Sequence, residues 1–307
     1  MDGKHIAAID LGTSKIMLTI AYVTGNDIQI ISCLKAPSDG IRNSCVYNPD
    51  KVCRKVMGLI RQAENELQLK VTQVVVGMPR FGVSQRLEIG RLEGIDQENS
   101  ITREDVEELK RAAQDKYHPE NPDIEELYGA VAQSFSNGDE IGLVESDVIG
   151  MYSPVLEGAF KLFIGKKKYL QNIDKVFKGT GISVARKYFT PEAVAQAVLT
   201  SYEMSNGVAL IDFGAGVTSV SIYLGNVMRY YASIPFGGAS VTDDIRKECT
   251  IQEELAENIK KAFGGCMPDR LLTLSEKVLN ISSSPSMPGP DTQISVKYLS
   301  EIITARV

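Results

Sequence analysis

In the stretch Ile6–Val23, IAAIDLGTSKIMLTIAYV, two apolar, β-prone runs flank a short polar turn that contains a glycine. A second polar turn at Thr24–Asp27 leads into another β-prone run, Ile28–Leu34. Strands that follow one another through tight turns form a β-meander. The beginning of the chain therefore predicts three neighbouring antiparallel strands.

The same pattern returns 202 residues later, in Val208–Tyr223, VALIDFGAGVTSVSIY. At this offset Asp10 and Gly12 correspond to Asp212 and Gly214, and each copy continues into a third β-prone run. An internal repeat of this kind indicates two structural units of the same architecture. We therefore predict an α/β protein with two similar domains that face each other.

Both turns carry residue types that bind polyphosphate. Glycines let backbone N–H groups approach phosphate oxygens, hydroxyl groups add hydrogen-bond donors, and a lysine neutralises phosphate charge. The candidates are Gly12, Thr13, Ser14 and Lys15 in the first turn and Gly214, Gly216 and Thr218 in the second. Asp10 and Asp212, at the ends of the two buried strands, can hold a hydrated magnesium ion between them. The repeat thus predicts two loops that close on one magnesium nucleotide.

The composition excludes several other classes of protein. The 33 basic and 39 acidic residues give a net charge of −6, which provides no electrostatic footprint for nucleic acid. No apolar run approaches the ~18 residues of a membrane-spanning helix. The five cysteines have no CxxC spacing, which indicates reduced thiols rather than a disulfide framework or a zinc site.

Capping residues followed by apolar residues at three- and four-residue steps predict the helices. The charged, interrupted region from about 83 to 163 has another character, and we predict that it is an inserted small α/β module. The predicted helices include Asn48–Leu67, one that begins with a capping box at Thr102–Asp105, one from the N-cap Thr190 to Asn206, and one with a capping box at Thr250–Glu253.

Four stretches resemble motifs of the actin-like ATPase superfamily, and within it those of the FtsA family of bacterial cell-division proteins. They are Ile9–Ile16, Thr190–Thr200, the second phosphate loop continued through Ile234–Ile245, and Ala256–Lys260. The resemblance covers essentially the whole chain and implies an actin-like, ribonuclease H-like fold of duplicated domains. It implies a subdomain 1A at 1–82 and 164–202, an inserted subdomain 1C at 83–163, the start of subdomain 2A at 203–242 and a subdomain 2B at 243–307.

The chain ends on Leu299–Val307, the amphipathic opening of a helix that has no C-cap. The Gly-Gly adenosine motif that the family carries after the second phosphate loop is absent from residues 246–307. We therefore expect that the second half is truncated, and that the rest of 2A and the family's C-terminal amphipathic membrane helix are missing.

The resemblance also implies roles for single residues. The second phosphate loop, Asp212–Thr218, has Ala215 where the family usually has a glycine. Gln196 lies in a context similar to that of the water-positioning glutamine of actin, and it would act with Asp10 and Asp212 in ATP hydrolysis that is slow at most. The resemblance places Gly237 and Gly238 at the start of a helix near the phosphates, Glu257 and Lys260 against the nucleoside, and Arg306 on the subdomain that binds the FtsZ tail.

The function implied by the resemblance is that of an ATP- and magnesium-binding protein that forms filaments. It would bind the C-terminal peptide of FtsZ and tether it to the anionic cytoplasmic membrane at the division septum. Two alternatives stay open. One is an actin homologue of pilus assembly of the PilM type. The other is a phosphotransferase of the sugar or acetate kinase type, which needs an acidic general base beside an acceptor pocket.

Overall fold

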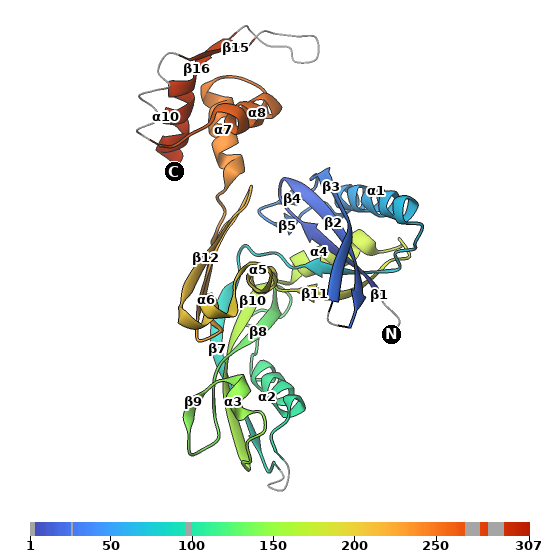
Figure 1. Cartoon of the computed structure of the whole chain (residues 1–307), viewed down its shortest axis with the longest axis vertical. Helices are drawn as coiled ribbons and strands as arrows, with labels where there is room; N and C mark the ends of the chain where they lie inside the picture. The colour runs from blue at the N-terminus through green and yellow to red at the C-terminus, as the bar shows by residue number, and fades with distance from the viewer. Residues whose placement is uncertain (1–3, 26, 96–99, 268–276, 282–291) are drawn as a thin grey trace. The chain divides into compact units, whose positions relative to one another are not determined.

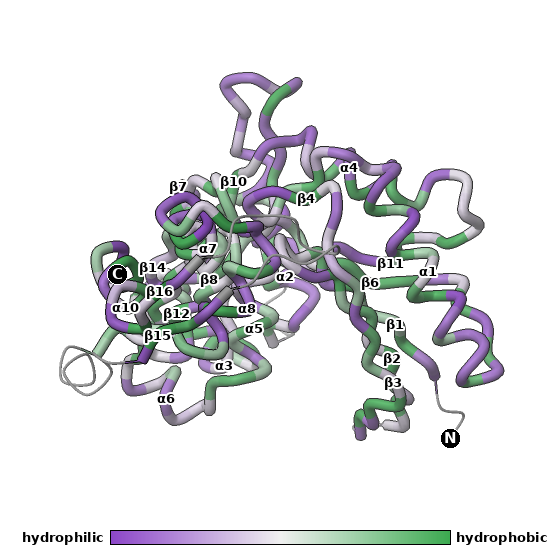
Figure 2. Tube along the Cα trace, turned by 90° about the horizontal axis from the view of Figure 1, so that it is seen from above, coloured by the Kyte–Doolittle hydropathy of each residue, from purple (hydrophilic) through white to green (hydrophobic). Residues whose placement is uncertain are grey.

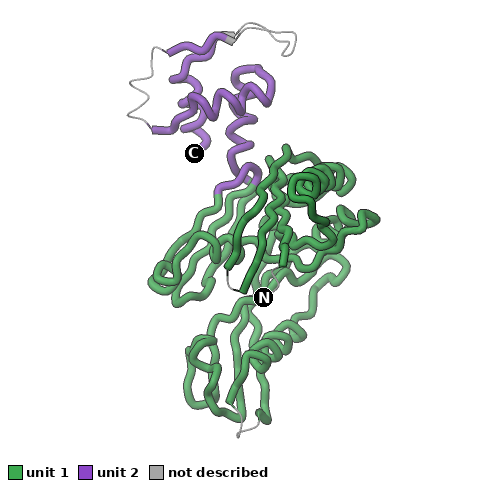
Figure 3. The backbone as a smooth tube through the Cα atoms, turned by 45° about the vertical axis from the view of Figure 1, so that its right-hand side comes forward, with its two compact units in different colours: residues 1–212, 217–235 green, residues 213–216, 236–307 purple. Residues whose placement is uncertain are grey.

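The computed structural model of the chain describes residues 4–25, 27–95, 100–267, 277–281 and 292–307. The chain divides into two compact units (Figure 3). Unit 1 comprises residues 1–212 and 217–235, and unit 2 comprises residues 213–216 and 236–307. Each unit contains a hydrophobic core of its own.

The main sheet of unit 1 has five strands in the order β11-β6-β1-β2-β3 (Figure 1). β1 (Lys4–Leu11), β2 (Lys15–Thr24) and β3 (Asp27–Pro37) are antiparallel neighbours. The meander predicted from the sequence is therefore confirmed. β6 (Gln73–Gly77) pairs in parallel with β1, and β11 (Ser183–Tyr188) pairs in parallel with β6.

Helices α1 (Pro49–Leu67) and α4 (Lys167–Phe177) pack against each other and against this sheet region. The predicted start of α1 is confirmed, since the Asn48 side chain accepts a hydrogen bond from the Lys51 amide at 3.1 Å. Apolar and polar segments alternate along the helix (Figure 2), and its buried face is made of Val52, Val56, Leu59, Ile60 and Ala63. A short hairpin, β4 (Ile41–Arg42) with β5 (Cys45–Val46), precedes α1.

The region from 83 to 163 builds a second, antiparallel sheet with its own core. Thr102 begins α2 with a complete capping box, in which its side chain accepts from the Asp105 amide and Asp105 accepts from the Thr102 amide. This predicted cap is confirmed. The strand order is β7 (Ser84–Glu93), β10 (Val155–Lys166), β8 (Glu125–Ser136), β9 (Ile141–Leu143), accompanied by α2 (Arg103–Asp115) and the short α3 (Glu145–Val148).

The second copy of the repeat forms a three-stranded sheet, β12 (Val208–Phe213), β13 (Thr218–Leu224) and β14 (Val227–Ile234). Tyr231 of β14 joins this sheet to the main core, because its ring packs edge-on at 5.4 Å from the Phe189 ring and 6.1 Å from the Phe163 ring.

The single helix predicted from Thr190 to Asn206 is wrong, because two helices, α5 (Thr190–Val198) and α6 (Ser201–Asn206), replace it. Thr200 starts α6 with a capping box to Glu203, and this local hydrogen bonding competes with a continuous helix. Thr190 is not an N-cap either. Its hydroxyl donates to the Met78 carbonyl at 2.7 Å and thereby fastens α5 to the loop after β6.

Unit 2 contains three helices among its described residues, and their apolar faces form one core. The predicted capping box at Thr250 is wrong, because Thr250 has a φ of 52° and Gln252 is the N-cap residue. Of the predicted range 243–307, residues 268–276 and 282–291 lie outside the described part of the chain. The elements are α7 (Gly238–Glu248), α8 (Glu253–Phe263), β15 (Val278–Ile281), β16 (Thr292–Ser295) and α10 (Val296–Arg306).

None of the helices in the described ranges is long and apolar enough to cross a membrane. The subdomain boundaries inferred from the resemblance stay a prediction.

The inserted sheet offers a test of how closely α2 packs on it. A Cβ added at Gly90 of β7 would lie 2.3 Å from the Leu109 carbonyl oxygen of α2, a backbone atom that cannot move alone. We expect Gly90→Ala to destabilise the inserted module by about 1–3 kcal/mol, the usual cost of overpacking. Hydrogen exchange of the β7 and β10 amides measures this loss.

Gly58→Ala is the matched control, because an added Cβ at this position in α1 has no atom within 4 Å apart from its chain neighbours and the nearby backbone of its own helix. Alanine should stabilise that helix by about 0.5–1 kcal/mol. An equal loss of protection in β7 and β10 for both variants would contradict the packing described here.

Candidate functional site

The two aspartates of the repeat lie around one arginine in unit 1. Asp10 is near the end of β1 and Asp212 near the end of β12, and Arg80 follows β6. The Arg80 guanidinium forms an ion pair with the Asp212 carboxylate, and it also interacts electrostatically with Asp10. The Arg80 side chain is only 18% exposed and that of Asp212 29%, so solvent screens this pair incompletely. The structure therefore gathers both predicted metal ligands around an internal cation.

The electrostatics of Asp10 and Arg80 reflect this arrangement. Surrounding protein atoms raise the pKa of the Asp10 carboxyl, although part of the residue still faces solvent, while Arg80 and then Lys15 lower it. Burial lowers the pKa of Arg80, and Asp10 raises it. Because a guanidinium stays protonated in proteins, Arg80 supplies a permanent positive charge here.

The first phosphate turn is tight and is connected to the loop that carries Arg80. A Cβ at Gly12 would lie 2.7 Å from the Lys15 carbonyl oxygen, so the turn closes only around a glycine. The Thr13 hydroxyl accepts a hydrogen bond from the Ser44 amide, and the Ser44 hydroxyl accepts one from the Arg80 amide, both at 3.0 Å. Ser14 and Lys15 are exposed.

Sequence reasoning missed Arg80, although a signal for it was present. Gly77, Pro79 and Arg80 directly follow the apolar run that becomes β6. β6 runs parallel to β1, so both strands end at the same edge of the sheet. Ligands of open α/β sheets bind at that edge. A charged residue just after β6 was therefore a candidate for the site of Asp10.

In unit 2 the second phosphate loop and the start of α7 approach each other through their backbones. The Gly238 amide donates to the Gly214 carbonyl at 3.0 Å and the Ala239 amide to the Ala215 carbonyl at 2.8 Å. A Cβ at Gly237 would lie 2.3 Å from the Gly214 oxygen. Only a glycine fits at Gly237, and the first amides of α7 are engaged by the loop.

Glu257 and Lys260 of α8 join this group, as their three-residue spacing allows. Lys260 Nζ donates to the Glu257 carboxylate at 2.6 Å, to the Thr242 hydroxyl at 2.7 Å and to the Gly238 carbonyl at 2.8 Å. Thr242, which sequence reasoning missed, also donates to Glu257. Gly214, Ala215, Gly237, Gly238, Glu257 and Lys260 thus lie in one neighbourhood of unit 2.

Four other predicted residues are placed as follows. Gln196 is exposed on α5, Gly216 is buried, and Thr218 is the first residue of β13. Arg306 forms an ion pair with both oxygens of Asp244, and its guanidinium lies 5.9 Å from the centre of the Phe236 ring. The side chain of Arg306 is 44% exposed, so it contributes to the surface of unit 2.

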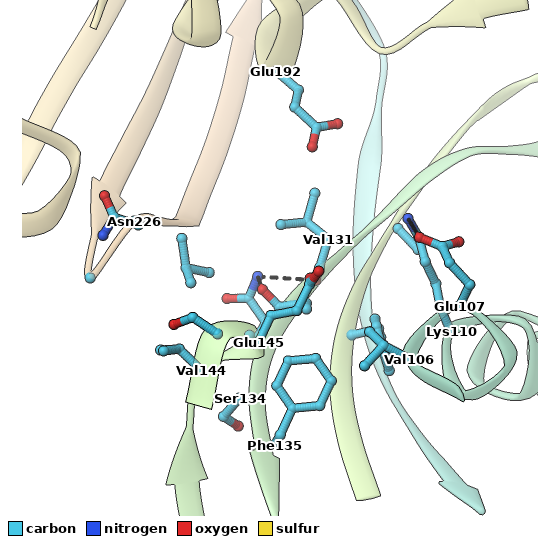
Figure 4. A pocket seen from close by; sticks show the side chains of 17 residues that line it. Val106, Glu107, Lys110, Val131, Ser134, Phe135, Val144, Glu145, Glu192 and Asn226 are labelled. Carbon is cyan, nitrogen blue, oxygen red and sulfur yellow. Dashed lines mark hydrogen bonds and ion pairs between the residues drawn. The ribbon is translucent and has the colours of Figure 1, made fainter. Parts of the chain in front are cut away.

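A cavity of about 290 Å³ in unit 1 lies apart from these residues. Glu192 of α5 points toward it from one side, and Val131 and Phe135 of β8 lie opposite (Figure 4). None of the residues predicted from the sequence lines this cavity. It therefore belongs to the inserted module and its neighbours rather than to the two phosphate turns.

The donor set at Asp10 and Asp212 fits a magnesium ion that arrives with a nucleotide. Within the described ranges, no group of three or more acidic, cysteine or histidine side chains could hold a metal. Magnesium bound to nucleotides usually has one or two protein carboxylates and completes its shell with waters and phosphates. Two carboxylates beside a glycine turn match that requirement.

Comparison with known proteins relates the chain to one family. The sequence profile of the family described as "Cell division protein FtsA" matches residues 209–295. Cell division protein FtsA of Neisseria meningitidis serogroup B is 29% identical over 99% of this chain and 71% of its own length. The protein of that name from Streptococcus pneumoniae serotype 2 is 27% identical over 97% of this chain and 63% of its own length.

The chain thus spans about two-thirds of the length of these curated relatives. Among solved structures, a chain of a PilM-PilN type IV pilus biogenesis complex superposes with a TM-score of 0.60 at 15% identity. The superposition covers 84% of this chain and 69% of the other. This likeness concerns the fold, and the predicted actin-like α/β fold is confirmed.

The ionisation of Glu257 generates a prediction for unit 2. Burial opposes ionisation of this carboxyl, but hydrogen bonds from Lys260, Thr242 and Lys261 outweigh it and lower its pKa to about 2. A lowered folded-state pKa stabilises the protein above the unfolded value near 4.5, and the stabilisation is lost as the pH falls toward 2. Because the side chain is one-third exposed, solvent screening limits the contribution to about 1 kcal/mol.

We therefore expect Glu257→Gln to lower the stability of unit 2 at pH 7 by about 1 kcal/mol, with a difference that shrinks between pH 5 and pH 2. Hydrogen exchange of the α8 amides at several pH values measures it. Glu254→Gln, an exposed neighbour on the same helix, should change stability by about 0.5 kcal/mol or less. A Glu257→Gln effect that is independent of pH would contradict the role of the charge.

Proposed function

Since this chain belongs to the FtsA family of cell-division proteins, we propose that it is an actin-like division protein that binds a magnesium nucleotide. The observation that supports this function best is the convergence of Asp10 and Asp212 on one cation in unit 1. The two residues hold the same position in the two copies of the repeat. A purely structural ion pair with Arg80 would need only one of these two aspartates.

In the proposed site each group of unit 1 has a distinct task. Asp10 and Asp212 would hold the ion, and the backbone of Gly12 with the exposed Ser14 and Lys15 would bind phosphate oxygens. A bound magnesium ion would supply charge neutralisation at the phosphates. Gln196, exposed on α5, is proposed to orient the attacking water, and hydrolysis by this site would be slow at most.

The residues gathered in unit 2 keep separate proposed roles. Glu257 and Lys260 would contact a nucleoside, and Gly237 and Gly238 would let the backbone of α7 approach the second phosphate loop. Ala215 and the neighbouring glycines of that loop would contact phosphate. Thr218, which begins β13 in unit 1, has the same proposed role. The close backbone packing around Gly237 supports a role in shaping the loop.

At the level of the cell, we propose that the whole protein forms filaments and binds the C-terminal peptide of FtsZ at the cytoplasmic face of the membrane in the division septum. The membrane contact would be made by an amphipathic helix of the kind that the resemblance implies. The likeness to the PilM chain concerns the fold, whereas the relatives by sequence are division proteins. The division role is therefore the proposal, and the pilus role is the outcome that would replace it.

The nucleotide site can be tested at Asp212. Asp212→Asn keeps the size of the side chain and removes its charge. We expect it to lower the affinity for ATP in the presence of magnesium at least tenfold, about 1.4 kcal/mol, because one of two ion ligands is lost. Calorimetric titration with and without EDTA measures the effect.

Asp139→Asn, at an exposed turn of the inserted module, is the control and should bind magnesium ATP as the unmodified protein does. Equal affinities of the Asp212→Asn variant and the unmodified protein would contradict the proposed site.

Partner binding can be tested at Arg306. We expect a labelled FtsZ C-terminal peptide to bind the protein in a fluorescence-polarisation titration, and Arg306→Ala to weaken it at least threefold. Arg306 is an exposed cation, and the ion pair with Asp244 holds its guanidinium in one orientation. Lys297→Ala, an exposed cation on the same helix, should leave the affinity unchanged.

Binding of a PilN peptide in place of the FtsZ peptide would overturn the division role. Equal losses of peptide affinity in Arg306→Ala and Lys297→Ala would show that peptide binding depends only on net charge. Arg306 would then not be part of the proposed contact.

A further inference from the structure

Arg80 is a charged residue beside Asp212 to which neither the repeat nor the resemblance gives a role. Its guanidinium pairs with Asp212 and interacts with Asp10, so one positive charge serves two carboxylates. Without it, neither carboxylate would have this counter-charge in a partly enclosed site. Two carboxylates around one place repel each other, and one of them takes up a proton more readily unless a cation offsets the repulsion.

Hydrogen bonds hold both the amide and the carbonyl of Arg80, while its side chain pairs with Asp212. The Arg80 amide donates to the Ser44 hydroxyl at 3.0 Å, and the Arg80 carbonyl accepts a hydrogen bond from the buried Tyr231 hydroxyl. Ser44 is bonded in turn to Thr13 of the first phosphate turn. With its main chain held, Arg80 can change partners by rotating its side chain alone.

A guanidinium and a divalent ion compete for the same oxygens of Asp212. A partly buried ion pair adds little net stability, because desolvation offsets most of the attraction. Replacement of the guanidinium by a more highly charged ion is therefore energetically accessible. Once displaced, the fixed fork of an arginine is suited to pair with phosphate oxygens.

We propose that Arg80 is a built-in counter-cation of this site, which neutralises Asp10 and Asp212 in the absence of a divalent ion and is displaced from them when a magnesium nucleotide binds. This inference rests on the proposed function, because it takes the two aspartates as ligands of the ion. It gives Arg80 control over how strongly nucleotide binding depends on magnesium. Arg80 lowers that dependence, because it competes with the ion and supports binding of the metal-free nucleotide.

The first experiment uses manganese alone and needs no nucleotide. Free Mn²⁺ is measured by electron paramagnetic resonance in titrations of the unmodified protein, Arg80→Gln, Arg80→Lys and Arg86→Gln. Arg80→Gln should bind Mn²⁺ at least tenfold more tightly than the unmodified protein, because the competing cation is gone. Arg80→Lys keeps the positive charge that competes with Mn²⁺ and should stay within about threefold of the unmodified protein.

Arg86→Gln is the matched control, because Arg86 lies on β7 with its side chain 46% exposed. It should not alter Mn²⁺ binding. Equal Mn²⁺ affinities of Arg80→Gln and the unmodified protein would overturn the inference, and so would an Arg80→Lys variant that binds as tightly as Arg80→Gln. If Arg80→Gln fails to fold, millimolar Mn²⁺ should restore the fold by replacing the lost charge. A variant that stays unfolded in Mn²⁺ would contradict the proposal.

The second experiment measures ATP affinity with magnesium and with EDTA. The dissociation constant for ATP in EDTA is divided by the dissociation constant in magnesium. This ratio should rise at least tenfold in Arg80→Gln and stay unchanged in Arg86→Gln. An equal loss of affinity in both conditions would mean that Arg80 is a simple phosphate ligand, and would overturn the inference. If neither the unmodified protein nor any variant binds ATP, the proposed function fails. The Mn²⁺ titration still decides the role of Arg80 in that case.

Discussion

A duplicated strand with an aspartate at its end creates an electrostatic constraint on this fold. Asp10 and Asp212 come from equivalent strands, and both lie by Arg80 in unit 1. Two carboxylates in a partly enclosed place stay ionised together more readily when a positive charge offsets their repulsion. Arg80 supplies that charge from the loop after β6, and the rest of unit 1 holds this loop in place.

Several elements of unit 1 meet at Tyr231. Its ring packs between Phe163 of β10 and Phe189 before α5, while its hydroxyl holds the Arg80 carbonyl. On the other side, Ser44 connects Arg80 to Thr13. The inserted sheet, the second meander and the first phosphate turn are thus coupled to one loop by packing and hydrogen bonds. This coupling explains how a site made of distant segments can be preorganised.

Local patterns in the sequence predicted much of this fold, because alternation, turn residues and caps act over a few residues. The meander, the helix after Asn48 and the capping box at Thr102 depend on such patterns. The two matched aspartates were likewise visible as a repeat. Two other local signals, at Thr190 and Thr250, led to wrong predictions of helix caps. Thr190 bonds Met78 across the sheet edge, and Thr250 adopts a left-handed backbone.

Local sequence patterns could not identify Arg80 and Thr242 as site residues, because the partners of these residues are far away in the chain. Arg80 pairs with a residue more than a hundred positions later, and Thr242 meets Glu257 and Lys260 only after α7 and α8 have packed. The parallel pairing of β1 and β6 was the missing information for Arg80. Knowledge of strand order, rather than of strand positions, would have identified it.

A crystal structure of the protein with Mn²⁺ and a non-hydrolysable ATP analogue, with the ion located by anomalous scattering, would test directly whether Arg80 yields Asp212 to the ion. We expect one Mn²⁺ peak between Asp10 and Asp212, with the Arg80 guanidinium no longer paired to Asp212. A nucleotide bound away from both aspartates, or an Arg80–Asp212 pair that persists with the ion bound elsewhere, would contradict it.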